Sequence, residues 1–338
     1  MNKVNKIQRF YLQWHITNKC NLKCLHCYQK KDQQVCKESS VEELEKVVNV
    51  FEHVANKWNI SLEVSLTGGE PFTKKKHLYF LLFHLQRKNF VKSINILTNG
   101  ALINDDDINK LHTIKKLRAI QISLDGHNNI IHDSIRGNGS FKTAIESIKN
   151  LKKNKLFVSV MMTLSKKNYL HIRNVYNLLK KLGVDSFGAD RFIPFTESNF
   201  DTNILSSKEM EVAVNTMICL KKNGNSPAIN TTRPLYCLSS DAEEQIGGPC
   251  SIGNGSLCLL PDGTALACRR LPIPLGNILV DGFYSIWYGS RLLWNIRNKD
   301  NLKNKCHNCS DLTSCGGCRA MAYALTNDYL EEDPSCWK

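Results

Sequence analysis

The chain has 338 residues, 42% of them hydrophobic, and a formal net charge of +14 at pH 7. It has no run of about 18 apolar residues, and its N-terminus lacks a signal-peptide pattern, so we expect a cytoplasmic protein with no membrane partner. The positive charge favours an anionic partner, such as an acidic peptide, a nucleic acid or a phosphorylated metabolite.

Apolar, β-branched runs alternate with helix-like segments from residue 10 to about residue 195. The expected strands are residues 10–17, 61–67, 93–98, 118–124, 157–164 and 185–193. The expected helices are residues 41–56, 77–88, 105–116, 141–153 and 169–182. Ser40 and Glu43 form a capping box before the first helix. Six βα units predict a parallel sheet, and because a closed barrel needs eight, we expect an α/β fold with a partial (β/α)6 TIM-like barrel.

The last third of the chain differs in composition from the barrel segment. A further helix is expected at about residues 207–222, and residues 223–249 are predicted to be an irregular connector. Residues 250–338 are rich in cysteine and poor in apolar runs, so we expect bound metal to replace part of the core there. The expected domains are residues 1–205, residues 206–249 and residues 250–338.

Three cysteines, Cys20, Cys24 and Cys27, follow the first expected strand. Cytoplasmic thiols stay reduced, so metal is a better explanation for such clustering than disulfides. A four-iron cluster held only by protein takes four cysteines, and three would leave one iron open to another ligand. Spacing alone also allows zinc with a distant fourth ligand, or Cys36 as a fourth cluster ligand.

The other distinctive motifs of the first half also follow expected strands. They are Gly68–Pro71, Thr98–Gly100 and Ser123–Gly126. The carboxyl ends of parallel strands meet on one face of the sheet, where such folds carry their chemistry. Local interpretations remain open, because the Asn-Gly and Asp-Gly pairs could be turns and Arg136 could be a surface charge.

A second group of cysteines occupies the last hundred or so residues. Cys250 and Cys268 flank two short apolar runs joined by Pro261-Asp262-Gly263, and this hairpin would bring both cysteines to one end. The remaining members of the group are Cys237, Cys258, Cys306, Cys309, Cys315, Cys318 and Cys336. Taken alone, the segment from Cys306 to Cys318 could also be a four-thiolate zinc site.

The cysteine loop resembles the signature of the radical S-adenosylmethionine (SAM) superfamily, with His26 in its aromatic place and Tyr28 next, and with Gly68-Gly69-Glu70-Pro71 about forty residues later. The resemblance implies that Cys20, Cys24 and Cys27 hold a [4Fe–4S] cluster whose open iron binds SAM. An electron from the cluster would then cleave SAM to a 5′-deoxyadenosyl radical. The residues that the resemblance places around SAM are His26, Tyr28, Gly68, Gly69, Glu70, Thr98, Asn99, Ser123, Asp125 and Arg136.

The C-terminal cysteines, with Trp287 and the CGGCRAMAYA segment, resemble the SPASM domain, which carries two auxiliary [4Fe–4S] clusters. The resemblance implies an outer cluster on Cys306, Cys309, Cys315 and Cys336, and an inner cluster on Cys250, Cys268 and Cys318. Cys237 is the expected fourth inner ligand, because we expect Cys258 to lie about 13 Å from Cys268 at strand rise. Cys258 could instead donate a hydrogen atom to a substrate radical, or could be an ordinary buried residue.

The resemblance implies a maturase that abstracts hydrogen from a ribosomally made peptide or protein and so crosslinks, epimerises or oxidises it. Three clusters with eleven thiolates would lower the net charge to about +9, which still suits an acidic peptide. A nucleic acid is not the expected partner. A flavodoxin- or ferredoxin-type reductant is expected. The short N-terminus leaves no room for a winged-helix leader-binding module, so leader recognition would need a separate leader-binding protein or another surface. The alternatives are formylglycine formation, as in anaerobic sulfatase maturases, and a non-catalytic iron–sulfur electron carrier. Sulfatase maturases tend to have an aspartate where this chain has Arg269.

Overall fold

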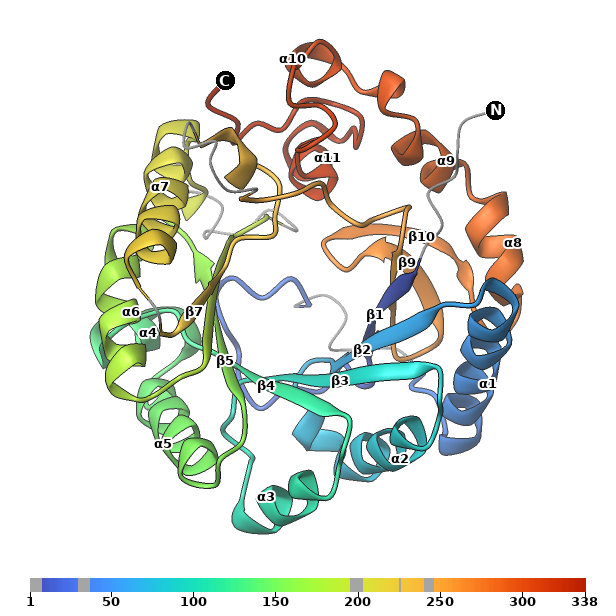
Figure 1. Ribbon diagram of the computed structural model, residues 1–338, viewed down its shortest axis with the longest axis vertical. Coiled ribbons are helices and arrows are strands. Elements are labelled where there is room, and N and C mark those ends of the chain that lie inside the picture. Colours follow the sequence, from blue (N-terminus) through green and yellow to red (C-terminus); the bar gives the residue numbers. More distant parts are fainter. Residues whose placement is uncertain (1–7, 30–36, 195–202, 225, 240–245) are drawn as a thin grey trace.

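A computed structural model describes residues 8–29, 37–194, 203–224, 226–239 and 246–338. The six expected strands form as β1 (Arg9–His15), β2 (Ser61–Thr67), β3 (Val91–Thr98), β4 (Leu117–Ser123), β5 (Val158–Leu164) and β6 (Ser186–Arg191). Each pairs in parallel with the next in sequence. The predicted partial barrel is therefore confirmed (Figure 1).

Helices between these strands lie on the outside of the barrel (Figure 1). They are α1 (Val41–Trp58), α2 (Lys75–Gln86), α3 (Asp105–His112), α4 (Asn129–Arg136), α5 (Ser140–Lys153) and α6 (Ile172–Lys181). The expected Ser40–Glu43 capping box begins α1. Helix α4 was not expected from the sequence; it is only eight residues long and begins at the Asn128 cap.

The sheet extends beyond the six βα units at both edges. β7 (Ala228–Asn230) pairs in parallel with β6, so the predicted connector is not wholly irregular. β8 (Ser256–Leu259) pairs in parallel with β1, and β9 (Thr264–Cys268) and β10 (Leu271–Asn277) follow as antiparallel neighbours. The expected boundary at residue 250 therefore lies between strands of one continuous ten-stranded sheet. Pairing with β8 covers the backbone groups that β1 would otherwise expose as an edge strand.

The remaining helices are α7 (Ser207–Asn223), α8 (Gly282–Gly289), α9 (Arg291–Arg297), α10 (Asn304–His307) and α11 (Arg319–Thr326). Short 3₁₀ turns are η1 (Pro71–Lys74), η2 (Tyr169–His171), η4 (Tyr236–Leu238) and η5 (Lys299–Asn301). In Figure 1 the segment with α10 and α11 lies between the two ends of the curved sheet. None of the helices in the described part of the chain has the length and apolar character to cross a membrane.

Strand β1 shows how the sheet separates core from cavity. Phe10, Leu12 and Trp14 are buried, whereas the alternating Tyr11 and Gln13 are only partly buried and line the barrel interior. Successive side chains of a strand point to opposite faces, so one face builds the apolar core and the other leaves polar groups inside the barrel.

Aromatic packing attaches the C-terminal segment to the barrel. The Phe283 ring of α8 lies 5.7 Å from that of Phe10 and 5.2 Å from that of Trp58, and Trp287 lies 5.3 Å from Phe10. Edge-on and offset contacts of this kind add to the free energy of burial. Helix α8 therefore holds the hairpin strands against β1 and α1.

Candidate functional site

A cavity of about 420 Å³ lies inside the barrel, where the carboxyl ends of the strands meet. It is lined by the loop after β1, the ends of β2 to β6, and the β8–β9 hairpin. The predicted site residues on its wall are Cys20, Cys24, His26, Cys27, Tyr28, Gly68, Gly69, Thr98, Asn99, Ser123, Arg136, Cys250, Cys258 and Cys268. Residues predicted to hold SAM and residues predicted to hold the inner cluster thus share one cavity.

Each cysteine of the first loop has a hydrogen-bond donor at its sulfur. Leu22 N lies 3.4 Å from Cys20 Sγ, and Gln29 N lies 3.4 Å from Cys27 Sγ. Arg136 Nη1 lies 3.9 Å from Cys24 Sγ. Such donors stabilise cluster thiolates and tune the reduction potential. Burial raises the pKa of Cys20 to about 11, so metal must displace its proton on binding. Cys36, the alternative fourth ligand, lies outside the described residues.

Gly68 and Gly69 support the cysteine loop directly. Gly69 N donates to Thr17 O and Glu70 N donates to Lys19 O, each over 2.8 Å. A Cβ on Gly69 would lie 2.6 Å from the Lys19 carbonyl carbon. The glycines are thus needed for close packing against the loop, in addition to the approach to a ligand that the sequence suggested.

Glu70 is fully buried and joins the β2 and β3 loops. Its carboxylate accepts from Thr98 Oγ1 (2.7 Å), Asn99 N (2.8 Å) and Phe72 N (3.1 Å). Burial raises the pKa of Glu70, although these donors favour the ionised form. The three predicted residues Glu70, Thr98 and Asn99 therefore form one unit at the cavity wall.

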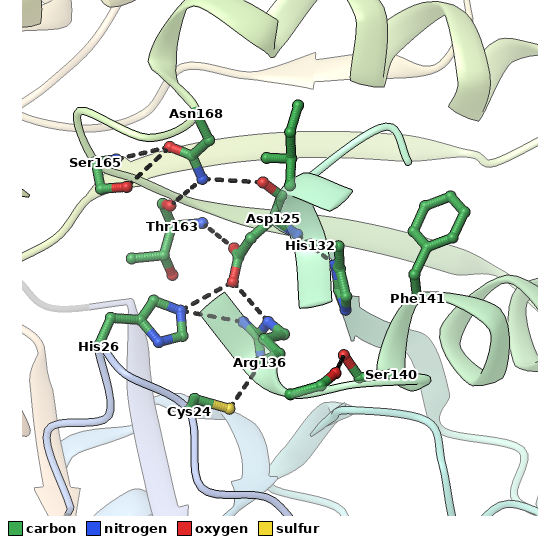
Figure 2. A network of polar contacts seen from close by, with 12 residues as sticks. Cys24, His26, Asp125, His132, Arg136, Ser140, Phe141, Thr163, Ser165 and Asn168 are labelled. Atoms are coloured by element: carbon green, nitrogen blue, oxygen red, sulfur yellow. Dashed lines mark hydrogen bonds and ion pairs between the residues drawn. The ribbon is translucent and has the colours of Figure 1, made fainter. Parts of the chain in front are cut away.

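Asp125 lies behind the wall and joins the cysteine loop to β5 (Figure 2). Its carboxylate accepts from Arg136 Nε (2.6 Å) and Thr163 N (2.7 Å), and His26 Nε2 lies 2.9 Å away. Burial opposes ionisation, but Arg136 and His26 hold the pKa of Asp125 far below its usual value. Both carboxylate oxygens have donors within the protein. We therefore assign Asp125 a positioning role, which differs from the expected contact with SAM.

The four predicted outer ligands surround a second cavity of about 270 Å³. Cys315 Sγ accepts from Leu235 N and Gly317 N, each at 3.4 Å, and Arg319 Nη2 lies 3.8 Å from Cys306 Sγ. In the described ranges, no three His, Cys, Asp or Glu side chains converge on a single-ion site. Thiols around a cavity of this size fit a multi-iron cluster, whereas structural zinc sites are closed around one ion.

The three predicted inner ligands are mutual neighbours. Burial, together with Cys268 and Cys318, raises the pKa of Cys250 to about 12. Burial raises the pKa of the Cys268 thiol, and the positive charge of the nearby Arg270 opposes this shift. Cys318 N donates to Asp333 Oδ2 over 2.8 Å, and Asp333 also pairs with Arg191. Cationic side chains and backbone donors beside these thiols suit a negatively charged cluster.

The structure changes the choice of a fourth inner ligand. Cys258 pairs with Leu266, two residues from Cys268, so the separation along the strand is about 7 Å and the expected 13 Å was wrong. The tight turn at residues 260–263 produces this register. A hydrogen bond to Cys315 raises the pKa of Cys237, which places this predicted inner ligand beside the outer set.

Sequence reasoning missed a group of charged cavity residues, namely Asp190, Arg191, Arg233 and Arg270. Asp190 and Arg191 end β6, and this position was an available signal because catalytic folds of this type use strand ends. Arg233 lies after β7 in the predicted connector, where no local pattern indicated a role.

Comparisons with known proteins identify two families that match this chain. Residues 14–179 match the family model of the radical SAM superfamily, and residues 250–310 match that of an iron–sulfur cluster-binding domain, SPASM. The chain is 27% identical to an AdoMet-dependent heme synthase of Methanosarcina barkeri, covering 96% of this chain and 95% of that protein. It is 28% identical to the subtilosin biosynthesis protein AlbA of Bacillus subtilis, covering 96% and 70% of the two chains.

Solved structures have the same fold. Streptococcus suis SuiB bound to SAM superposes with a TM-score of 0.76 at 17% identity, covering 98% of this chain and 78% of SuiB. The protein anSMEcpe, with bound AdoMet and a Cp18Cys peptide, superposes with a TM-score of 0.74 at 19% identity, covering 97% and 94%.

We predict that Gly69→Ala disturbs the cysteine loop. The added methyl group overlaps the Lys19 backbone, so unfolding should become easier by about 1–3 kcal/mol and the iron content after anaerobic reconstitution should fall. Gly289→Ala is the matched control, because a Cβ there meets nothing within 4 Å. Thermal unfolding and iron analysis check both variants, and a Gly69→Ala protein as stable and as iron-rich as the control would contradict the packing.

We predict that Asp125→Asn leaves the Arg136 guanidinium buried without a counter-charge. Removing one partner of a buried pair costs about 3–5 kcal/mol, which should lower the thermal midpoint by roughly 5–15 °C. The double variant Asp125→Asn/Arg136→Met should recover part of that loss, because it removes the uncompensated charge. A double variant no more stable than Asp125→Asn would contradict the importance of the pair.

Proposed function

We propose that this chain, which belongs to the radical SAM superfamily and carries an iron–sulfur SPASM domain, modifies a ribosomally made peptide by hydrogen abstraction. The two domains imply [4Fe–4S] clusters as cofactors, and the chain is an enzyme of this superfamily. The observation that carries the proposal is the shared cavity. It brings the three-cysteine loop, the polar strand ends and the hairpin cysteines together.

Cys20, Cys24 and Cys27 are the proposed ligands of the first cluster. When bound, that cluster supplies the electron that cleaves SAM to a 5′-deoxyadenosyl radical. Arg136 places positive charge beside Cys24 and is itself held by Asp125. Met161, Ile193 and Leu257 contribute apolar surface to the cavity. Excluding water in this way limits side reactions of a reactive intermediate.

Cys258 has two proposed roles. It is 2% exposed, lines the shared cavity and pairs with Leu266, which lies two residues before Cys268. This register supports a role as the fourth inner ligand. A Cys258 that remains free would be placed to donate a hydrogen atom to a substrate radical.

A peptide substrate is supported by relatives that bind peptides. SuiB has been solved with its precursor peptide SuiA, and anSMEcpe with a Cp18Cys peptide. AlbA is named for bacteriocin biosynthesis.

Two other reactions remain candidates. The similarity to heme synthases over nearly the whole chain makes a tetrapyrrole the second candidate substrate. Sulfatase maturation is less favoured, because Arg269 occupies the position at which those enzymes tend to carry an aspartate. The guanidinium carbon of Arg269 lies 5.1 Å from the Tyr28 ring centroid. An arginine there would not act as a base at neutral pH.

Two cysteine variants should separate the first cluster from the auxiliary ones. Cys24→Ala should abolish formation of 5′-deoxyadenosine from SAM and dithionite. Cys309→Ala should lose about four irons while SAM cleavage persists. Anaerobic reconstitution, iron analysis and chromatography of the nucleoside products check both outcomes, and SAM cleavage by Cys24→Ala would contradict the assignment.

Co-expression tests the substrate class. Small open reading frames beside the gene should yield a peptide of altered mass with the wild-type enzyme and of unaltered mass with Cys24→Ala. Conversion of a carboxylated metalloporphyrin, with every peptide unchanged, would contradict peptide modification. Formylglycine in a sulfatase peptide would instead support sulfatase maturation.

A further inference from the structure

Three arginines form a positively charged part of the shared cavity, which we call the cationic wall: Arg233, Arg269 and Arg270. Arg233 follows β7, and the other two follow β9. Asp190, at the end of β6, is the one acidic residue on the cavity lining in the described part of the chain. The wall therefore has more positive than negative side chains.

A single carboxylate oxygen of Asp190 accepts hydrogen bonds from two of these arginines. Arg233 Nη1 lies 3.0 Å from Asp190 Oδ2, and Arg270 Nη2 lies 2.7 Å from the same atom. Arg191, the neighbouring residue on β6, differs because it makes a bidentate pair with Asp333, at 3.1 and 2.6 Å. The charge of Arg191 is thus neutralised by Asp333, whereas Arg233 and Arg270 share the single negative charge of Asp190.

The negative charge of an inner cluster explains why Arg270 lies in the cavity, but it does not explain the position of Arg233. Arg270 pairs with Asp190 and also lies near the Cys268 thiol. Arg233 instead reaches the Met161 sulfur at 3.8 Å, a weak acceptor, and its Nε is buried with no hydrogen-bond partner in the described structure. A donor without an acceptor is costly, so the protein alone does not satisfy the Arg233 guanidinium. The Arg233 side chain is 25% exposed and so remains accessible.

We propose that Arg233 binds a carboxylate of the substrate. This inference rests on the proposed function and names a feature of its substrate. The planar guanidinium matches a carboxylate with two parallel hydrogen bonds. The carboxylate comes from an acidic side chain of the peptide or from its C-terminus.

This contact selects against neutral substrates. A peptide with Gln or Asn in place of the acid leaves the guanidinium charge without its partner inside the cavity, and such mismatches give strong discrimination. The contact also anchors the substrate at a site separate from the cysteine loop, so that a neighbouring C–H group can be presented to the radical.

Peptide selection tests the proposal. A random peptide library with both ends blocked, and a second library with free C-termini, are selected for binding to the anaerobically reconstituted, SAM-loaded chain without reductant. The same selections use Arg233→Gln and the control Arg173→Gln, whose residue is exposed on α6. Iron content and SAM binding must match those of the wild type in both variants.

Wild type and Arg173→Gln should retain peptides with an acid at one fixed position, and Arg233→Gln should not. Replacing that acid by its amide should weaken binding to the wild type by about ten- to a hundredfold, and should have little effect on Arg233→Gln. Enrichment in the free C-terminus library alone identifies the α-carboxylate as the source. Peptides without an acidic preference, or with the same preference in Arg233→Gln, would overturn the proposal.

If the wild type retains no peptide, the proposed function fails while the carboxylate inference can still be decided. Hemin and its dimethyl ester are then the probes. A carboxylate site is supported if the wild type binds hemin but not its dimethyl ester, or if Arg233→Gln does not bind hemin. Equal binding of both probes, or no binding of either, overturns it.

Discussion

The buried contact between Asp125 and Arg136 is the constraint on which the site depends. It joins β4 and α4 to the cysteine loop through Cys24 and His26 (Figure 2). Gly69 and Glu70 hold the same loop from the β2 side through backbone hydrogen bonds. A loop without regular secondary structure is thereby fixed on two sides, and its thiols can keep their geometry before metal binds.

The continuous sheet explains how two cysteine groups far apart in sequence share one cavity. Because β8 pairs with β1, Cys258 lies in register with Gln13 on the neighbouring strand. Cys250 and Cys268 then line the same space as Cys20 to Cys27. The aromatic packing of α8 on α1 and β1 supports this arrangement. A hairpin in a separate domain would not bring these thiols to the barrel interior.

Local patterns predicted most of the fold and the cysteine sets, because strand periodicity and ligand spacing can be recognised within short segments of the sequence. The pairings between distant segments were not predictable in this way. The role of Asp125 depends on Arg136, His26 and β5 together, and the Cys258–Leu266 register depends on the turn. Arg233 gave no signal because its partner Asp190 is forty-three residues earlier in the chain. Such contacts follow from tertiary structure, which propensity alone does not contain.

The proposed activity requires that the first cluster has an iron that no protein side chain binds. The most direct measurement is electron paramagnetic resonance of the dithionite-reduced chain, with Cys268 and Cys309 replaced by alanine so that the first cluster dominates the spectrum. Adding SAM should shift the g values of that cluster, because SAM binds its open iron. A spectrum unchanged by saturating SAM would show that the iron is already ligated and would contradict the proposed activity.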